Sequence, residues 1–227
     1  MITLLIDVVS NNSILALFDQ KKSQKAIEKI RLDHNEMRSE NVIPALESLL
    51  DNSTYCYSDI KKVICVTGPG NYTNIRTGIA VAKSISLVND IDAYGLTQHE
   101  LIAQTSQYPL IQGDLVVIIH SMHDDFYYQE FESNTQKKQD PILLNAADIM
   151  DKIESSKANI IETGNEFLNY LIKKSIDLNN LHSNYLIPDS SLSKICASTS
   201  DDFSKIDAKY IKTPNFVKYT KKNIYEW

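Results

Sequence analysis

One stretch of the sequence, residues 62–79, limits the fold more than any other. The run Lys62–Val66 is typical of a buried strand, and the tight turn Gly68-Pro69-Gly70 follows it directly. The next segment, Thr73–Val88, is apolar on nearly all its faces, so we expect a helix that is largely buried. A buried strand, a tight turn and a buried helix in immediate succession favour an α/β fold.

The segment before residue 60 predicts an antiparallel meander and one amphipathic helix. Ile2–Ile6, Ser13–Phe18 and Lys25–Leu32 are short apolar or alternating runs, and the connections between them are too short to hold helices. Apolar residues then recur at helical spacing and predict a helix with one apolar stripe: Val42, Ile43, Leu46, Leu49 and Leu50. Ser39 or Asn41 would cap this helix, although a start near residue 35 stays open.

The rest of the chain continues the alternation of strands and helices with weaker signals. After residue 88 we expect a strand at Ile91–Tyr94 and a helix at Thr97–Thr105. The second half predicts a strand pair, a helix, a strand and a helix, in this order: Leu115–His120, Phe126–Phe131, Ala146–Ser155, Asn159–Glu162 and Glu166–Lys174. Residues 179–199 are polar and are expected to form a loop.

Composition favours a cytoplasmic globular protein. Of the 227 residues, 43% are hydrophobic and 23% are charged, which suffices for a stable core. No apolar run approaches the roughly 20 residues of a membrane span, and the first residues lack the basic segment of a signal peptide. Cys56, Cys65 and Cys196 are odd in number and widely spaced, so neither a disulfide framework nor a zinc site is expected.

The distribution of charge argues against a dedicated nucleic-acid-binding protein. The chain carries a net charge of -6, whereas such proteins are usually basic. Residues 203–227 differ, because they combine six Lys and several aromatic residues with only Asp207 and Glu226. This C-terminal segment could contact RNA through charge and stacking, but a solvated tail is the commoner outcome for such a terminus.

Candidate phosphate-binding residues gather around the glycine-rich turn. A strand that runs into such a turn and a helix N-terminus presents backbone N–H groups that favour an anion. Arg76 lies one turn inside the helix and could clamp a phosphate, while Asp7 ends the first strand and could hold a metal or a catalytic water. The block lacks the Gly-Lys-Ser/Thr of a P-loop, and a plain strand-to-helix turn with a surface Arg76 explains the same residues.

Neither a metal centre nor a nucleophilic triad is predicted. His120 and His123 precede two aspartates, but two His at i, i+3 need a third ligand, and the sequence indicates none. No Cys neighbours a His, and no Gly-x-Ser-x-Gly occurs.

Four blocks of the sequence occur in the order found in a known family. They are Leu4–Asp7, Val42–Leu46, Thr67–Gly78 and Gly95–Ala103. The third block keeps six residues of the family's most specific motif: Gly68, Pro69, Gly70, Thr73, Arg76 and Gly78. With these blocks, the first 105 residues resemble the TsaB family of bacterial tRNA threonylcarbamoyladenosine biosynthesis proteins, which are non-catalytic paralogues of TsaD.

The resemblance implies an actin-like α/β fold of the ASKHA, ribonuclease H-like class. Such a fold has two lobes, each with a mixed sheet flanked by helices. It divides this chain into an N-terminal lobe at residues 1–105, completed by the C-terminal segment, and a smaller, degenerate second lobe at residues 106–205. The basic aromatic segment at residues 206–227 follows.

The function implied by the resemblance is that of a non-catalytic scaffold. Such a protein pairs with TsaD as a heterodimer, joined by TsaE, and TsaD transfers a threonylcarbamoyl group to adenosine 37 of tRNAs reading ANN codons. tRNA is then an indirect partner, and a homodimer of the isolated chain is an open alternative. No cofactor, metal or membrane contact is expected, although weak nucleotide binding stays open. TsaD carries His-x-x-x-His where this chain has His99 and Ala103, so the metal pair is absent.

Departures from the family pattern fall on polar positions. The usual Asp-Thr-Ser/Ala-Thr after strand one is Asp7-Val8-Val9-Ser10 here, so one hydroxyl position remains. The degenerate phosphate-loop motif consists of Asp7, Ser10, Gly68, Pro69, Gly70, Thr73, Arg76 and Gly78. The resemblance also implies that two helices pack against TsaD. The expected interface residues are Val42, Ile43, Leu46, Leu49, Leu50, Ile79, Lys83 and Ser86. Burial of the same residues in the core of this chain is the alternative explanation of their spacing.

Two other functions stay open from the residues. One is an ATP-dependent phosphotransferase-like enzyme of the same fold, which would use Asp7 and the Gly68–Gly70 turn. That enzyme would need a phosphate loop in each lobe, and the second-lobe candidate, Glu162–Asn165, is weak. The other is an RNA-binding module acting through the C-terminal segment, which the acidic net charge disfavours.

Overall fold

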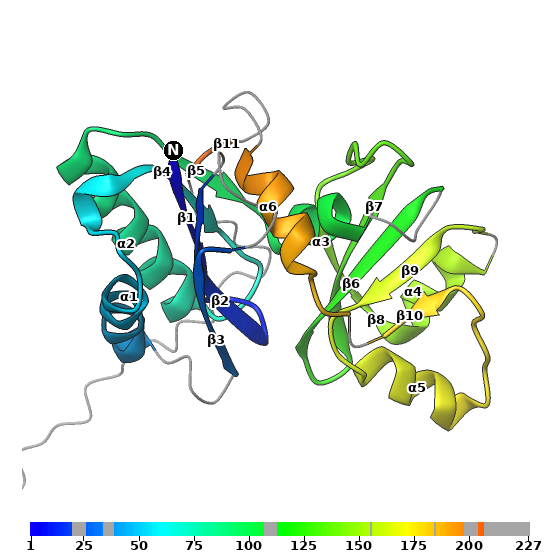
Figure 1. The fold of residues 1–227 in the computed structure, drawn as a ribbon. Helices are drawn as coiled ribbons and strands as arrows, with labels where there is room; N and C mark the ends of the chain where they lie inside the picture. The colour runs from blue at the N-terminus through cyan, green and yellow to red at the C-terminus, as the bar shows by residue number, and fades with distance from the viewer. Residues whose placement is uncertain are drawn as a thin grey trace, which may run out of the picture.

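Two mixed β-sheets, each with helices packed against it, make up the structure (Figure 1). The computed structural model describes residues 1–19, 26–33, 39–106, 113–154, 156–183, 185–197 and 204–206. Within these ranges no helix is long and apolar enough to cross a lipid bilayer.

The first sheet has six strands in the order β11-β5-β4-β1-β2-β3. Its strands are β1 (Ile2–Asp7), β2 (Asn12–Asp19), β3 (Glu28–Asp33), β4 (Ile60–Val66), β5 (Ala93–Leu96) and β11 (Ser204–Lys205). The first three strands form an antiparallel meander, β4 and β5 add in parallel, and β11 closes the edge in antiparallel pairing with β5. Every residue of β1 is buried, because β1 is central and both of its faces are covered.

Helices cover both faces of the first sheet. The elements are a 3-10 turn (Ser39–Asn41), α1 (Val42–Asp51), a second 3-10 turn (Tyr57–Asp59), α2 (Tyr72–Asn89) and α6 (Asp189–Ala197). Their apolar residues join those of the strands in one continuous core. Figure 1 shows α1 and α2 on the outer side of this sheet and α6 on the side that faces the second sheet.

The second sheet has five strands in the order β10-β9-β6-β7-β8. Its strands are β6 (Leu115–Met122), β7 (Asp125–Phe131), β8 (Ile142–Asn145), β9 (Asn159–Glu162) and β10 (Leu181–His182). Its helices are α3 (Gln98–Ser106), α4 (Ala146–Ile153) and α5 (Glu166–Lys174). One face buries an apolar core with α4 and α5, and the other buries a second core with α3.

The two sheets share one connectivity. In each, three antiparallel strands in chain order are followed by two strands that add in parallel on the other side of the first strand. The carboxyl ends of parallel strands lie at one edge of a sheet, where ligands of open α/β sheets usually bind. Asp7 ends β1 at this edge of the first sheet, and Thr163 follows β9 at the corresponding edge of the second.

Two expectations from the sequence need correction. Residues 179–199 were expected to form a loop, but they contain β10 and α6. The α6 residues Leu192, Ile195 and Cys196 are buried in the core of the first sheet, and three apolar residues are too few to stand out in a polar segment. The sequence also did not predict the edge strand β8. Its four residues are too few for a clear pattern, and the strand forms by pairing with β7. By contrast, β9 and α5 have the predicted bounds.

Candidate functional site

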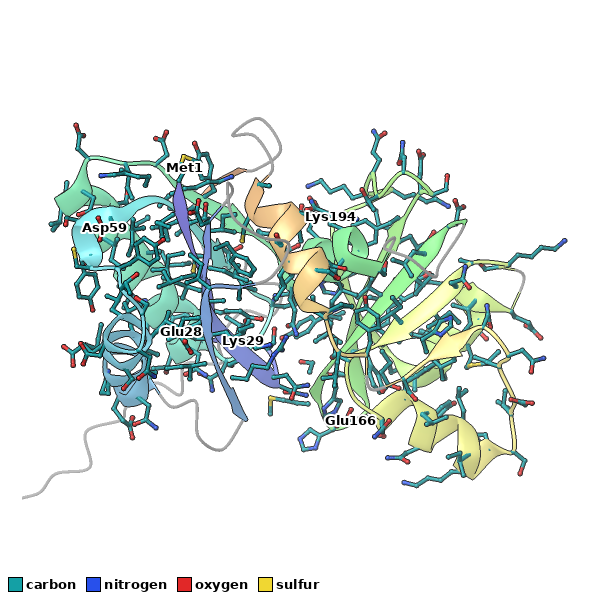
Figure 2. The ribbon with its side chains drawn as sticks, in the orientation of Figure 1. Met1, Glu28, Lys29, Asp59, Glu166 and Lys194 are labelled. Carbon is teal, nitrogen blue, oxygen red and sulfur yellow. The ribbon has the colours of Figure 1, made fainter. Side chains whose placement is uncertain are left out.

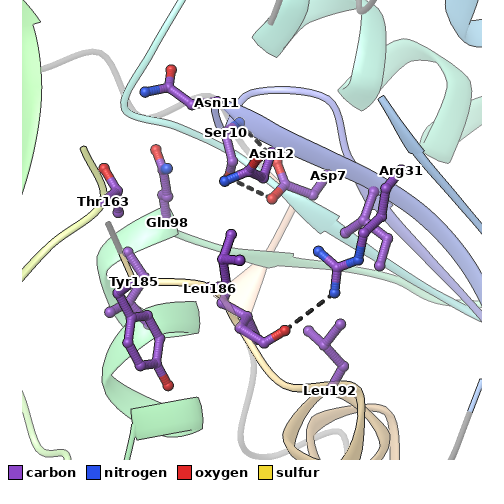
Figure 3. Close-up of a pocket in the computed structure, with 13 residues that line it drawn as sticks. Asp7, Ser10, Asn11, Asn12, Arg31, Gln98, Thr163, Tyr185, Leu186 and Leu192 are labelled. Carbon is purple, nitrogen blue, oxygen red and sulfur yellow. Dashed lines mark hydrogen bonds between the residues drawn. The ribbon is translucent and has the colours of Figure 1, made fainter. Parts of the chain in front are cut away.

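A cleft opens between the two lobes at the carboxyl edges of their sheets (Figure 3). It encloses about 450 Å³, counting the space open to solvent. The first lobe contributes Asp7, Ser10 and Arg31, α3 contributes Gln98, and the second lobe contributes Thr163. Apolar wall comes from the segment 185–187 and from α3 and α6.

Asp7 lies in this cleft with both carboxylate oxygens engaged. Its Oδ1 accepts hydrogen bonds from the backbone N–H groups of Val9 and Ser10, each at 3.0 Å, and its Oδ2 accepts one from the Ser10 hydroxyl. Burial raises the pKa of Asp7, and the hydrogen bonds from Ser10 and Val9 partly oppose that rise. The carboxylate therefore holds its own loop in place.

Replacing Asp7 by Asn should flatten one part of the pH dependence of stability. The pKa of Asp7 is higher in the folded chain than its ordinary value of 3.8. Between these two pKa values the folded chain keeps a proton on Asp7 that the unfolded chain has lost. Its contribution to stability is therefore fully present below pH 3.8 and falls as pH rises through the folded pKa. Urea unfolding between pH 3.5 and 7 should show this decline in the wild type and not in Asp7→Asn. Identical profiles would contradict it, and Asn12→Ala serves as the control, because Asn12 lines the same cleft and this change leaves Asp7 with its hydrogen bonds to Val9 and Ser10.

The glycine-rich block of residues 68–78 does not line the cleft. A Cβ on Gly70 would lie 2.3 Å from Cγ1 of Val9, and a Cβ on Gly78 would lie 2.8 Å from Cγ2 of Val8. These glycines thus allow the turn and α2 to approach the loop after β1, whose two valines fill the space between them. The geometry supports packing rather than phosphate binding as the role of the two glycines.

The N-terminus of α2, the expected anion site, is capped from within the chain. The Asn71 side chain accepts hydrogen bonds from the N–H groups of Thr73 at 3.0 Å and Asn74 at 3.2 Å. Arg76 is exposed, where its Nη1 donates to the Tyr72 hydroxyl at 2.8 Å and its guanidinium lies 5.2 Å from the Tyr72 ring centroid. The motif residues Thr73 and Arg76 are therefore not brought together with Asp7 and Ser10.

The corresponding turn of the second lobe is closed by a buried carboxylate. Glu162 is fully buried, and its two oxygens accept hydrogen bonds from the N–H groups of Phe167 at 2.6 Å and Leu168 at 3.2 Å. Burial raises the pKa of Glu162, and these two bonds oppose the rise. The first turn of α5 thus has an internal anion where a phosphate loop would receive an external one.

The sequence did not indicate that Arg31, Gln98 and Thr163 would line one cleft. Arg31 was given no role from the sequence, and its Nη2 donates to the Ile187 carbonyl at 3.1 Å across the cleft. Gln98 lies in the Gly95–Ala103 block, where it was given no role, and Thr163 lies in the weak phosphate-loop candidate Glu162–Asn165. Their place in the cleft depends on the packing of two lobes, which no local pattern reveals.

The side chains of His99 and His120 each contact a backbone carbonyl. His99 is completely buried, its Nε2 lies 3.2 Å from the Tyr127 carbonyl, and burial lowers its pKa to about 4. On the β6–β7 hairpin, His120 Nε2 lies 2.8 Å from the His123 carbonyl. Across the described ranges, no group of three or more His, Cys, Asp or Glu side chains is placed to hold a metal ion.

Most of the α1 interface residues expected from the sequence belong to the core. Val42, Leu46, Leu49 and Leu50 are buried against the first sheet, so the expectation that they face a partner is wrong for these four. Ile43 is exposed on the same helix. Of the α2 positions, Ile79 is buried, Ser86 is half-buried and Lys83 is exposed. The helical period was correct, but it could not show which side of the stripe the sheet covers.

The expected RNA-contacting segment cannot be placed. Apart from Ile206, residues 206–227 lie outside the described residues, so its contact with RNA stays a prediction.

Comparisons with known proteins find relatives in tRNA threonylcarbamoyladenosine biosynthesis. The family model of TsaD, tRNA N6-adenosine threonylcarbamoyltransferase, matches residues 34–224. The chain is 24% identical to TsaB of Buchnera aphidicola subsp. Schizaphis graminum, a tRNA threonylcarbamoyladenosine biosynthesis protein, over 72% of this chain and 78% of that protein. It is 22% identical to TsaB of Buchnera aphidicola subsp. Acyrthosiphon pisum, over 63% and 65%.

Solved structures share the fold. A Pseudomonas aeruginosa protein with similarity to peptidase YeaZ superposes with a TM-score of 0.73 at 14% identity, covering 93% of this chain and 99% of that one. YeaZ from the same organism superposes with a TM-score of 0.64 at 14% identity, covering 86% and 90%. With the sheet connectivity that both lobes share, this confirms the expected α/β fold of two mixed sheets flanked by helices.

Proposed function

The chain belongs to the TsaD family of tRNA N6-adenosine threonylcarbamoyltransferases, and from this we propose that it serves tRNA threonylcarbamoyladenosine biosynthesis as a non-catalytic subunit. Its partner is TsaD, joined by TsaE, and its role is to support the transfer of the threonylcarbamoyl group by TsaD. The acceptor is adenosine 37 of tRNAs reading ANN codons. The names of the curated relatives support this assignment to the pathway.

The observation that carries the non-catalytic role is that the polar groups best placed for chemistry bind the chain's own backbone. Asp7 is engaged by its own loop, and Glu162 by the first turn of α5. His99 is buried with Ala103 one turn later, where a second metal ligand would be needed. A phosphotransferase would need an available carboxylate and two open phosphate loops, so this alternative has less support.

An exposed apolar surface on the outer helices supports a protein partner. Leu87 and Val88 near the end of α2 are 84% and 82% exposed, and Ile43 of α1 is 46% exposed. Lys83 is exposed one turn before Leu87, and the small residue Ala80 is exposed one turn earlier still. Apolar residues with small neighbours on one helix face allow a partner helix to approach closely. We therefore assign TsaD binding to the outer face of α2 around Leu87.

Replacing Leu87 by Asp should weaken TsaD binding at least about tenfold, because a charge would then lie in a desolvated helix contact. Its folded stability should not change, since the side chain contributes little to the core. Isothermal titration calorimetry with purified TsaD measures the effect. Ile172→Asp on α5 is the matched control, because Ile172 is 63% exposed on the second lobe. Wild-type affinity in Leu87→Asp would overturn the assignment of this surface.

The function is tested by reconstitution. The chain should co-purify with the TsaD of its organism, and TsaD with TsaE should modify tRNA efficiently only when the chain is added. Modification by the chain without TsaD, or turnover of ATP by the chain alone, would overturn the non-catalytic role. Equal modification with and without the chain would overturn the proposal as a whole.

A further inference from the structure

We propose that the C-terminal segment, residues 207–227, docks on the exposed apolar end of α2 and competes there with TsaD. The chain would then carry an internal inhibitor of its own partner surface. This inference rests on the proposed function, because the docking site is the face assigned above to TsaD binding. It is supported by the exposed apolar surface, by the acidic groups that border it, and by the basic aromatic sequence of the segment that continues the chain beside it.

The apolar surface lies where α2 ends against the second 3-10 turn. Leu87 and Val88 of α2 and Tyr57 of the turn are exposed, and these three residues are called the α2-end surface below. The Asn89 side chain donates to the Tyr57 carbonyl at 2.6 Å, which joins the turn to the end of α2. Adjacent exposed aliphatic and aromatic side chains form a surface that gains stability when a docking segment removes it from water.

Carboxylates border the α2-end surface. Burial raises the pKa of Tyr57, and the negative charges of Glu47 and Asp51 raise it further, so both carboxylates lie near its hydroxyl. Among the described residues, the exposed carboxylates of α1, of the 3-10 turn and of the segment after α2 are Glu47, Asp51, Asp59, Asp90 and Asp92. The exposed lysines beside them are Lys61 and Lys83. The border is therefore net negative and favours a basic segment.

Strand β11 brings the C-terminal segment to this surface. It pairs antiparallel with β5, so that Lys205 lies opposite Tyr94 and the chain runs toward the start of β5. Only three residues separate the start of β5 from the end of α2, and Figure 1 shows β11 at the end of the first lobe where α2 also ends. Ile206 is half-buried against the core of the first sheet. Residues 207–227 therefore begin beside the α2-end surface, and a segment of this length can span about 70 Å when extended.

The sequence of the segment complements the surface. It has five Lys against Asp207 and Glu226, a net charge of +3. Its aromatic residues are Tyr210, Phe216, Tyr219, Tyr225 and Trp227. The lysines match the acidic border, and the aromatic rings match the exposed Leu87 and Val88. Because the segment belongs to the same chain, its effective concentration at the surface is on the order of millimolar, so a weak contact suffices to compete with TsaD.

Docking can be measured without TsaD through Trp227, the only tryptophan of the chain. The tail-reversed variant of the full chain combines Lys218→Glu, Lys221→Glu and Lys222→Glu. Acrylamide should quench Trp227 with a Stern–Volmer constant at least about twofold larger in this variant than in the wild type. Salt at about 1 M should bring the wild type close to the variant, because it screens exposed charge pairs.

Two further variants separate docking from a general effect of charge. Adding Glu47→Lys and Asp51→Lys to the tail-reversed variant restores opposite charges and should restore the shielding of Trp227. Lys173→Glu with Lys174→Glu is the control, because both lysines are exposed on α5 in the second lobe, and it should be quenched as the wild type is.

Competition is measured by calorimetry with purified TsaD. The tail-reversed variant should bind TsaD at least about threefold more tightly than the wild type. Phe216→Ser with Tyr219→Ser removes aromatic contacts without changing the net charge and should also tighten binding. The α5 control should bind TsaD as the wild type does.

Docking is contradicted if acrylamide quenches Trp227 equally in the wild type and the tail-reversed variant. Shielding that rises with protein concentration would place the segment on a second copy, and shielding that requires added tRNA would assign it to RNA; each overturns the proposal. Unchanged TsaD affinity in both tail variants would overturn the competition. Absence of TsaD binding in every variant would overturn the proposed function and the competition with it, whereas the quenching of Trp227 still decides the docking.

Discussion

Replacing Leu49 by Asp should abolish the folded state. Leu49 is fully buried in the core between α1 and the first sheet. Truncating a buried leucine costs about 2–5 kcal/mol, and an unpaired buried carboxylate adds several more. Because a domain is stable by only about 5–15 kcal/mol, this single change removes most or all of that stability. Far-UV circular dichroism, size-exclusion chromatography and urea unfolding would report the loss.

The matched control for Leu49→Asp lies on the same helix. Ile43 is 46% exposed, so Ile43→Asp places the same charge in water and should change the free energy of unfolding by about 1 kcal/mol or less. A Leu49→Asp protein with a normal urea midpoint and no affinity for TsaD would contradict this expectation. That outcome would put Leu49 at the partner interface after all.

Acid should destabilise the protein through His99 by about 3 kcal/mol. The ordinary pKa of 6.5 falls to about 4 in the folded state, because burial disfavours the imidazolium. Between these two values the unfolded chain binds a proton that the folded chain does not. The contribution of neutral His99 to the free energy of unfolding is therefore fully present above pH 6.5 and is lost as pH falls toward 4. Each unit of pKa difference corresponds to about 1.36 kcal/mol.

The His99 effect can be separated from that of the carboxyl groups by comparison with a variant. His99→Gln keeps an N–H donor that can reach the Tyr127 carbonyl but does not titrate. The free energy of unfolding should fall by about 3 kcal/mol less between pH 7 and 4 in His99→Gln than in the wild type. His182→Gln is the control, because it makes the same substitution at an exposed histidine. Parallel profiles for wild type and His99→Gln would contradict the role of His99.

Much of the first lobe was predictable because its signals are local. The buried strand, the glycine-rich turn and the apolar helix at residues 60–89 are short-range features, and the structure has all three. Strand β9 and helix α5 were likewise predictable from bounded apolar runs. Helix α6 was not, since its three buried residues become a pattern only when the first sheet lies beneath them.

The candidate site was predictable only in part. Asp7 and Ser10 were expected at the carboxyl edge of the first strand, and both line the cleft. Arg76 was expected beside them, but it lies on the exposed side of α2 with Tyr72. Gln98 lay in the Gly95–Ala103 block without an assigned role, because its place in the cleft depends on the packing of two lobes.

By itself, the sequence determined the order of strands and helices from β1 to α3, the family and the loss of hydroxyl and metal-binding positions. These depend on residue identity and on spacing along the chain, which the sequence records directly. Only the tertiary structure decided which side of α1 is core, that Gly70 and Gly78 face Val9 and Val8, and that Asp7 and Glu162 bind the chain's own backbone. The physical reason is that burial and hydrogen-bond partnership are properties of pairs of segments, and a periodic pattern describes one segment at a time.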